Sequence, residues 1–328
     1  MLQDPSGRRI DYLRISVTDR CNLRCIYCMP SQGVRLIEYK EILRYEEIIR
    51  IVRIASLLGV RKVRLTGGEP LRRRDITFLI KGISSIDGIQ EIALTTNGVL
   101  LKKYARSLKE AGLTRINISL DSLDPSRYRE ITGGGDIGTV LSGIEEAEWA
   151  GLTPISINMV PVRGINDKEI EAFARLTLEK PYRIRFIEFM PIGAKDFWSP
   201  ERYIPEEEIR KRIEVIGRLE PAGLNTGGPA RYWRFPGAKG MIGFISALSN
   251  HFCNECNRLR ITSDGKIRPC LFSETEIDLK PVLRGSSDDQ ELMRIMSLAV
   301  QCKPSGHGLT SDNRALNSVL RPMSKIGG

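Results

Sequence analysis

The sequence lacks the features that mark membrane and secreted proteins. No apolar run among its 328 residues approaches the roughly 20 residues that a membrane-spanning helix needs. The stretch before Arg8 and Arg9 has no apolar core of the kind found in secretory signals. Aromatic residues make up only 6% of the chain, and they do not interleave with basic residues as in a nucleic-acid-binding surface. We therefore expect a soluble, cytoplasmic protein that contacts neither a membrane nor a nucleic acid.

The composition is that of a globular protein with a basic balance. Apolar residues make up 41% and charged residues 27%, which excludes disorder, collagen and coiled coil for the chain as a whole. Lys and Arg number 50 against 40 Asp and Glu, so the net charge is +10. This excess favours an anionic partner such as a nucleotide, although a general solubility charge is the alternative.

Six β-rich segments alternate with amphipathic segments over the first 195 residues. The expected strands cover residues 12–17, 62–66, 91–95, 115–120, 154–160 and 183–189, and the expected helices cover residues 41–58, 76–84, 100–110, 137–150 and 167–178. Gly59, Gly112 and Gly151 fit helix C-caps. The alternation predicts an α/β fold with a parallel sheet, either doubly wound or a barrel. The pattern ends after about residue 195, and we expect a domain boundary near residue 220.

Three cysteines follow the first expected strand with the spacing C-x3-C-x2-C. They are Cys21, Cys25 and Cys28. Parallel α/β sheets place their chemistry at the carboxyl ends of the strands, so the position suits a site. Three thiolates on one short loop can hold three irons of a four-iron cluster and leave the fourth iron open for a substrate. A structural zinc site normally closes its fourth position, and no nearby His or Cys is available to do so.

A second group has the spacing C-x2-C-x13-C. Between Cys256 and Cys270, a strand–turn–strand pattern with Asp264 and Gly265 at its tip should fold Cys270 back beside Cys253 and Cys256. Half a zinc ribbon is one interpretation, and a three-cysteine cluster is another. The zinc interpretation needs a fourth ligand, for which the candidates are Cys302, His251 and His307. We otherwise expect Cys302 to be a small packed residue.

The first motif, with an aromatic residue before its last cysteine, resembles the signature of the radical S-adenosylmethionine (SAM) enzymes. The wider string resembles one family among them, the GTP 3′,8-cyclases of molybdenum cofactor biosynthesis; it comprises Arg14, Thr18-Asp19, Asn22, Arg24 and Cys28-Met29-Pro30. This resemblance implies an incomplete (βα)6 TIM-type barrel over residues 1–220. A smaller C-terminal iron–sulfur domain, residues 221–328, would cover the barrel opening.

The same resemblance implies a lyase reaction with two [4Fe–4S] clusters and SAM as cofactors. Reductive cleavage of SAM would give a 5′-deoxyadenosyl radical, which would abstract the 3′ hydrogen of GTP, and the ribose radical would attack C8 of guanine. Cys21, Cys25 and Cys28 would hold the first cluster. Cys253, Cys256 and Cys270 would hold the second cluster, whose open iron would bind the guanine end of GTP. A buried cavity would protect the radical.

The resemblance also assigns roles to single residues. The expected SAM contacts are Tyr27, Gly68, Glu69, Ser119 and Met190. The expected GTP contacts are Arg14, Arg64, Thr95, Ser156, Arg258 and Arg260. The expected catalytic residues are Arg258, Arg260 and the C-terminal Gly327 and Gly328, whose thin backbone can enter an active site.

Two further features bear on the GTP assignment. Ser156 stands where the family usually has a lysine for the triphosphate, and Arg163 or Lys168 are candidates to replace that charge. Arg72, Arg73 and Arg74 are expected to form a solvated basic face.

Two rival functions are considered beside the cyclase. One is a radical SAM enzyme that modifies a peptide or RNA, and the other is a non-enzymatic iron–sulfur electron carrier or sensor. The Gly67-Gly68-Glu69-Pro70 loop and the polar strand ends argue against the second. The expected partners are a flavodoxin- or ferredoxin-type reductant, cyclic pyranopterin monophosphate synthase as the next enzyme, and a second copy of the chain in a homodimer.

Overall fold

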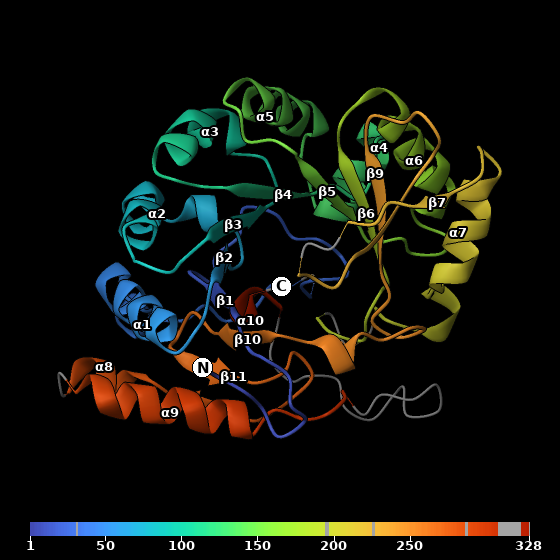
Figure 1. The fold of residues 1–328 in the computed structure, drawn as a ribbon. Helices are drawn as coiled ribbons and strands as arrows, with labels where there is room; N and C mark the ends of the chain where they lie inside the picture. The colour runs from blue at the N-terminus through green and yellow to red at the C-terminus, as the bar shows by residue number, and fades with distance from the viewer. Residues whose placement is uncertain (31, 194–196, 225–226, 286–287, 308–322, 328) are drawn as a thin grey trace.

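The computed structural model describes residues 1–30, 32–193, 197–224, 227–285, 288–307 and 323–327. Twelve strands within these ranges form one strongly curved sheet, with helices around its outer face (Figure 1). In sheet order the strands are β12 (Ile277–Asp278), β11 (Lys266–Arg268), β10 (Arg258–Ile261), β1 (Tyr12–Ser16), β2 (Lys62–Thr66), β3 (Glu91–Thr96), β4 (Arg115–Ser119), β5 (Ser156–Met159), β6 (Arg183–Ile187), β9 (Met241–Ile245), β8 (Arg231–Arg234) and β7 (Glu220–Pro221).

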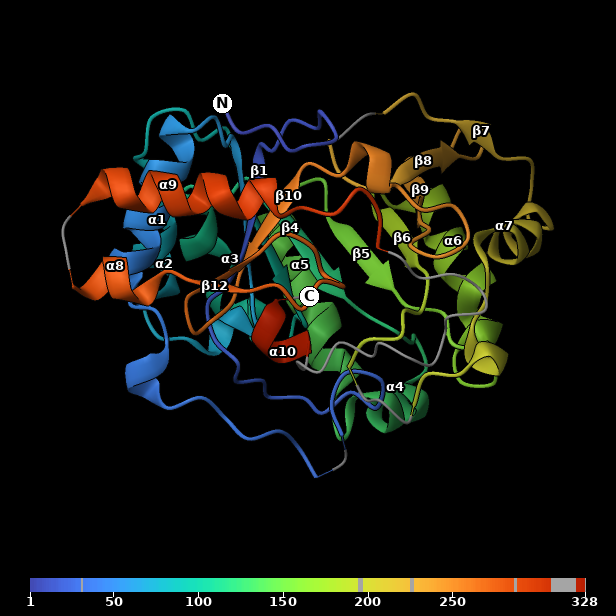
Figure 2. The ribbon, with the colours of Figure 1, turned by 90° about the horizontal axis from the view of Figure 1, so that it is seen from below.

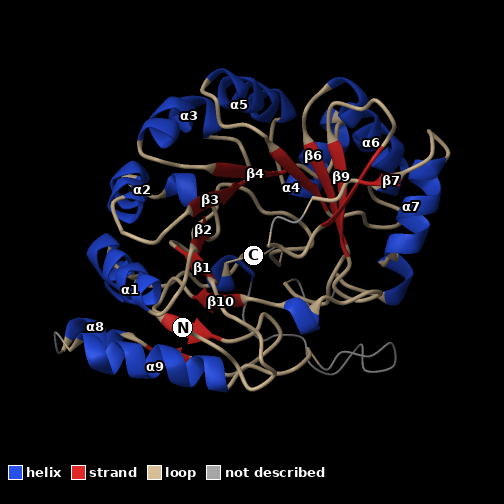
Figure 3. Ribbon diagram, viewed as in Figure 1, coloured by secondary structure: helices blue, strands red, loops and turns tan. Residues whose placement is uncertain are grey.

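The six expected strands are confirmed as β1 to β6. They lie side by side in chain order and every neighbouring pair is parallel. A doubly wound sheet would reverse its direction of growth partway, so the order selects the barrel. Figure 3 shows the strands as an inner ring and the helices as an outer one.

The helices follow the expected alternation with two differences. They are α1 (Tyr45–Leu57), α2 (Ile76–Ser84), α3 (Leu101–Glu110), α4 (Pro125–Thr132), α5 (Ile137–Trp149), α6 (Ile170–Glu179), α7 (Glu206–Glu214), α8 (Lys280–Arg284), α9 (Asp289–Gln301) and α10 (Met323–Ile326). The first helix begins at Tyr45 rather than at residue 41, because Ile42 is extended and the Glu47 carboxylate accepts a hydrogen bond from the Arg44 N–H at 2.6 Å, which caps the helix there. Helix α4, capped by Asp124, and the helices α7 to α10 were not expected.

Strands from the C-terminal part of the chain stand on both sides of the six-stranded core. Strand β10 pairs in parallel with β1, and β9 pairs in parallel with β6. The expected hairpin between Cys256 and Cys270 is confirmed as antiparallel β10 and β11, with Gly265 at a φ of +83° in its turn. The C-terminal part therefore flanks the opening that a six-stranded barrel leaves, while the boundary near residue 220 stays a prediction.

Alternation along the strands separates the core from the barrel interior. On β1, Leu13 and Ile15 are fully buried in the apolar core, whereas Tyr12 and Arg14 line an interior cavity. Helix α10 lies inside the ring of strands, close to β1 (Figure 1, Figure 2). Among the described residues, none of the helices has the length and apolarity needed to cross a bilayer.

Candidate functional site

A single cavity of about 350 Å³ reaches both cysteine groups. Its wall contains all six cysteines of the two motifs: Cys21, Cys25, Cys28, Cys253, Cys256 and Cys270. None of them forms a disulfide. Two groups separated by more than 220 residues in sequence therefore face one interior space, because the second group precedes and follows the β10–β11 hairpin that pairs with β1. We call these sets the first and second cysteine triads.

The first triad lies on the loop after β1, and Tyr27 ties this loop to the end of β4. The Tyr27 hydroxyl donates a hydrogen bond to Asp121 Oδ2 at 2.5 Å, and the backbone N–H of Cys28 donates to the Cys25 carbonyl at 2.9 Å. Burial raises the pKa of Cys28 to about 12, with Cys21 and Asp121 adding to the shift. Burial also raises the pKa values of Cys21 and Cys25, and no cation of the described residues is among the causes that act on the three thiols. Ionising all three therefore calls for a bound metal group, and the donor set fits three irons of a cluster.

The Gly67–Gly68 loop packs directly against the backbone that precedes the first triad. A Cβ atom on Gly68 would lie 2.5 Å from the Arg20 carbonyl oxygen, so only glycine allows this approach. Both glycines line the cavity, as do Ser119, Met190 and Tyr27.

Glu69, in contrast, is fully buried and does not belong to the cavity wall. Its carboxylate accepts hydrogen bonds from the N–H of Leu71 at 2.9 Å, the N–H of Asn97 at 2.7 Å and the Thr96 hydroxyl at 2.7 Å. Burial outweighs these bonds and raises the pKa of Glu69 to about 7. Glu69 therefore joins the loop after β2 to the end of β3.

Three arginines form a row across neighbouring parallel strands. The strand register pairs Arg14 of β1 with Arg64 of β2 on one side and with Arg260 of β10 on the other, and all three line the cavity. Burial, with Arg260 and Arg64 close by, lowers the pKa of Arg14 well below its usual value. Arg64 Nη1 donates to the Thr95 hydroxyl at 3.3 Å. Like charges side by side in a buried wall repel, so this row is suited to an anion.

Neither expected substitute for the missing lysine lines the cavity. Ser156 is buried and outside the cavity wall, and Arg163 pairs with Glu208 at 2.7 Å. Lys168 is also absent from the wall. The wall instead contains Arg185 of β6, whose guanidinium donates to Asn117 and whose pKa burial lowers to about 10.

The second triad has a more cationic surrounding than the first. Lys303 Nζ lies 3.5 Å from Cys256 Sγ, and Arg258 Nη2 lies 3.7 Å from the same sulfur. Burial raises the pKa of Cys256, but Arg258 and Lys303 outweigh it and lower the pKa to about 6. These cations stabilise a thiolate, so the donor set fits an anionic three-thiolate cluster site.

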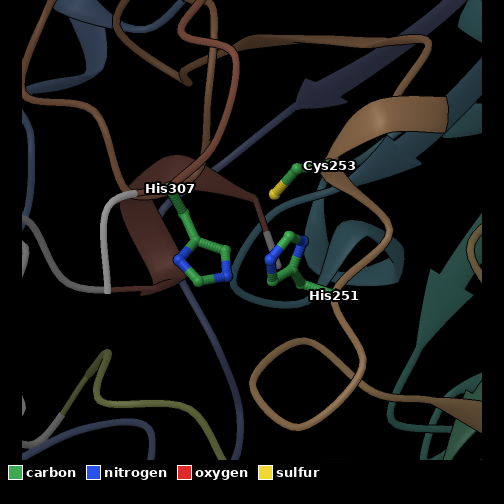
Figure 4. Close-up of side chains that lie close together, drawn as sticks. All are labelled: His251, Cys253 and His307. Carbon is green, nitrogen blue, oxygen red and sulfur yellow. The ribbon is translucent and has the colours of Figure 1, made fainter. Parts of the chain in front are cut away.

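Two histidines flank Cys253 of the second triad (Figure 4). One ring nitrogen of His251, one ring nitrogen of His307 and the sulfur of Cys253 lie within 4.8 Å of one another. The side chain of His307 also contacts the Ala247 carbonyl at 2.9 Å. Cys302 is exposed and outside the cavity wall, so its expected packing is wrong.

The C-terminal tail reaches this cavity through α10. Arg260 Nη1 donates to the Gly327 carbonyl at 2.7 Å, and Gly327 has a φ of +81°. A Cβ atom there would lie 3.3 Å from Ser16 Cα and would clash with the Thr66 hydroxyl. Gly328 lies outside the described residues.

The expected basic face at residues 72–74 is wrong for its middle residue. Arg73 is half-buried, and its guanidinium donates to the carbonyls of Val17 and Leu43, each at 2.6 Å, while stacking 4.1 Å from the centre of the Tyr45 ring. Arg73 therefore holds the loop after β1 to the segment before α1, whereas Arg72 and Arg74 are exposed.

Sequence reasoning missed three cavity residues. Arg183 and Arg185 are separated by one residue on an expected strand, so their side chains share one face of it. This spacing could have indicated that Arg185 faces the barrel interior. Asp121 lies two residues after Ser119, just beyond the expected strand 115–120, and this position was a usable signal. Lys303 had no local signal, since it lies 47 residues beyond Cys256 and reaches it only in the folded chain.

Family models match two parts of the chain. Residues 15–177 match the model described as Radical SAM superfamily, and residues 182–309 match the model described as Molybdenum Cofactor Synthesis C. Two relatives, both named GTP 3′,8-cyclase, illustrate the similarity over the full length. The protein from Thermodesulfovibrio yellowstonii is 50% identical over 329 residues, and that from Moorella thermoacetica is 51% identical over 328 residues. Both alignments cover 100% of this chain and 100% of the relative.

A solved structure supports the fold. The crystal structure of Streptococcus suis SuiB bound to S-adenosylmethionine superposes with a TM-score of 0.59 at 18% sequence identity. The match covers 90% of this chain and 72% of that chain. At this identity the likeness concerns the fold alone, and it agrees with a radical SAM type of partial barrel.

Proposed function

Because the chain belongs to the GTP 3′,8-cyclase family of the radical SAM superfamily, we propose that it converts GTP to 3′,8-cyclo-7,8-dihydro-GTP. This reaction is the first step of molybdenum cofactor biosynthesis, and the enzyme is a lyase whose cofactors are two [4Fe–4S] clusters and SAM. When bound, the first cluster and SAM supply the 5′-deoxyadenosyl radical chemistry that removes the ribose 3′ hydrogen and lets C3′ bond to C8 of guanine. The observation that carries the proposal is the single cavity shared by both triads.

The first triad end of the cavity is the proposed SAM site. Cys21, Cys25 and Cys28 hold the first cluster, and the backbone at Tyr27 and Gly68 contacts SAM. Ser119 and Met190 complete the site from the ends of β4 and β6, and their place in the wall supports this role. Glu69 fits a positioning role, because its carboxylate is already engaged with Leu71, Thr96 and Asn97 behind the wall.

The arginine row is the proposed triphosphate site. Arg14 and Arg64 bind phosphate oxygens through bidentate guanidinium contacts, with Thr95 beside Arg64. Arg185 extends the row across the barrel and supplies a cation that Ser156 does not. These buried cations hold the nucleotide in one orientation, so that the ribose faces the SAM end of the cavity.

The second triad end is the proposed guanine site. Cys253, Cys256 and Cys270 hold the second cluster, and Arg258 and Arg260 flank the substrate. Arg260 also fixes the Gly327 carbonyl, which supports a tail that enters the cavity and excludes water around the reacting ribose. We extend the proposal to Gly328, the next residue of the tail.

The finer partner assignments also belong to the proposal. A flavodoxin- or ferredoxin-type protein supplies electrons, cyclic pyranopterin monophosphate synthase consumes the product, and the chain forms a homodimer in the cytoplasm. Residues 1–220 act as the radical SAM partial barrel and residues 221–328 as the part that carries the second cluster.

An anaerobic product analysis tests the function. The reconstituted chain is incubated with dithionite, SAM and GTP, and the products are separated by liquid chromatography and weighed by mass spectrometry. We expect 5′-deoxyadenosine together with a GTP isomer of unchanged mass. Cys302→Ser, which changes an exposed cysteine outside the cavity, should match the wild type, whereas Cys21→Ala should give neither product.

The outcomes separate the rival functions. If 5′-deoxyadenosine forms while GTP stays intact, the substrate assignment fails and a peptide or RNA substrate takes its place. If SAM is not cleaved at all under reducing conditions, the result contradicts the radical SAM assignment and favours an electron carrier.

A further inference from the structure

The segment after α9 brings a buried lysine to the second triad. Lys303 is 5% exposed, and its backbone N–H donates to the Val300 carbonyl at 3.0 Å, which continues the end of the helix. Helix α9 is anchored by buried apolar residues, among them Met296 and Val300, in the main core. The position of Lys303 is therefore set by the packing of a whole helix rather than by a loop.

The ammonium of Lys303 has three protons, and three acceptors surround it. Nζ lies 3.5 Å from Cys256 Sγ, 2.9 Å from the Arg258 carbonyl and 2.8 Å from the Pro269 carbonyl. Pro269 directly precedes Cys270, so one side chain holds the two arms of the β10–β11 hairpin that carry different cysteines. With its donors engaged by the protein, Lys303 is a fixed charge at the cavity wall rather than a mobile substrate contact.

Arg8 links the segment after α9 to Cys253, the remaining cysteine of the second triad. Its Nη1 donates to the Cys253 carbonyl at 2.6 Å and to the Ser305 carbonyl at 3.0 Å, and its Nη2 donates to the Pro304 carbonyl at 2.6 Å. Arg8 is itself buried. Residues 303–305 are thus bonded, directly or through Arg8, to the chain around each cysteine of the second triad.

We propose that Lys303 is a positioning residue that fixes the second triad and raises the reduction potential of the cluster bound there. Hydrogen bonds and positive charge at a ligating sulfur stabilise the more negative, reduced state of an iron–sulfur cluster. Arg258 also approaches Cys256 Sγ, at 3.7 Å, but its side chain is one of the proposed GTP contacts and is therefore coupled to substrate. Lys303 provides the part of this effect that does not depend on substrate. The inference rests on the proposed assignment of a cluster to the second triad.

The test isolates the second cluster in the full-length chain. Replacing Cys21, Cys25 and Cys28 by Ala leaves the second triad as the site for reconstitution, and the iron content is measured first. The midpoint potential is then determined by titration followed with electron paramagnetic resonance. Lys303→Met removes the charge at similar length, and Lys303→Arg keeps it. Lys239→Met removes a charge from an exposed site and serves as the matched control.

We expect Lys303→Met to lower the reduced-to-oxidised ratio at a fixed potential about tenfold, a negative shift of about 59 mV for a one-electron couple. Lys303→Arg should stay closer to the wild type, and Lys239→Met should show no shift. An assembled cluster with an unchanged potential in Lys303→Met would overturn the inference. If Lys303→Met takes up no iron, Lys303→Arg decides the matter: iron uptake supports the positioning role, and an equal loss refutes a role for the charge.

The proposed function can fail separately. If the variant without the first triad but with Lys303 intact binds no iron, the second triad is not a cluster site. In that case the proposed function fails rather than the role of Lys303. Iron uptake with the expected spectrum, followed by no effect of Lys303→Met, rejects only the inference about Lys303.

Discussion

Replacing Gly327 by alanine should release the C-terminal tail from the cavity. A non-glycine residue in the left-handed region costs roughly 1–2 kcal/mol, and Gly327 has a φ of +81°. The new Cβ would also clash with the Thr66 hydroxyl, which itself donates to the Ile15 carbonyl at 3.4 Å. Strain of this size lowers the equilibrium constant for docking of the tail by a factor of roughly 5–30 before the clash is counted. We therefore expect the rate of GTP conversion to fall about tenfold or more.

Two readouts locate the effect in the tail. Product formation is followed by mass spectrometry, and hydrogen exchange of the C-terminal peptide reports the docking, because the Gly327 N–H donates to the Met323 carbonyl at 3.0 Å. Gly306→Ala is the matched control, since no atom lies within 4 Å of a Cβ built there. Wild-type rates together with wild-type protection in Gly327→Ala would refute the reasoning that a docked glycine tail is required.

Three further predictions address other parts of the cavity. Arg185→Met should weaken GTP binding about tenfold or more, as measured by isothermal titration, because a buried cation at the nucleotide is lost. The affinity for SAM should rise about tenfold from pH 6 to pH 8, because the raised pKa of Glu69, about 7, leaves its carboxyl neutral below that pH. Only the charged carboxylate accepts hydrogen bonds at both oxygens from Leu71, Thr96 and Asn97, and these bonds hold the glycine loop at the SAM site. Tyr27→Phe should lower the free energy of unfolding of the cluster-free chain by about 1–3 kcal/mol in urea titrations, because the hydrogen bond to buried Asp121 is lost.

A specific result would contradict each of these three predictions. Unchanged GTP affinity in Arg185→Met would remove that side chain from the triphosphate site. A pH dependence of SAM binding that persists in Glu69→Gln would assign it to another group. A Tyr27→Phe variant as stable as the wild type at neutral pH would mean that the contact with Asp121 does not hold the loop.

The parts of the fold that depend on local periodicity could be predicted from sequence. The six strands and five of the ten described helices were predicted because apolar residues repeat at the strand or helix period over each segment. The cysteine triads were visible because each motif is compact along the chain. The start of α1 at Tyr45 was missed because Ile42 continues the apolar pattern although the chain is extended there.

The remaining features depend on contacts between distant segments. Lys303 meets Cys256 because α9 packs back onto the sheet, and nothing in its local sequence marks this. Glu69 was expected to contact SAM because a carboxylate can accept hydrogen bonds from an ammonium group. Its hydrogen bonds to Thr96 and Asn97 at the end of β3 could not be predicted, because they join separate strand ends. Arg73 looked solvated because it lies in a basic run, but two carbonyls within reach hold it.

Transfer of the ribose hydrogen tests the central claim most directly. GTP deuterated at C3′ is supplied to the reconstituted, reduced enzyme with unlabelled SAM, and the 5′-deoxyadenosine is analysed by mass spectrometry. A cavity that holds SAM at the first triad and GTP against the arginine row predicts one deuterium in the 5′-deoxyadenosine and its loss from the cyclised nucleotide. Unlabelled 5′-deoxyadenosine beside a cyclised product that keeps its deuterium would contradict the account.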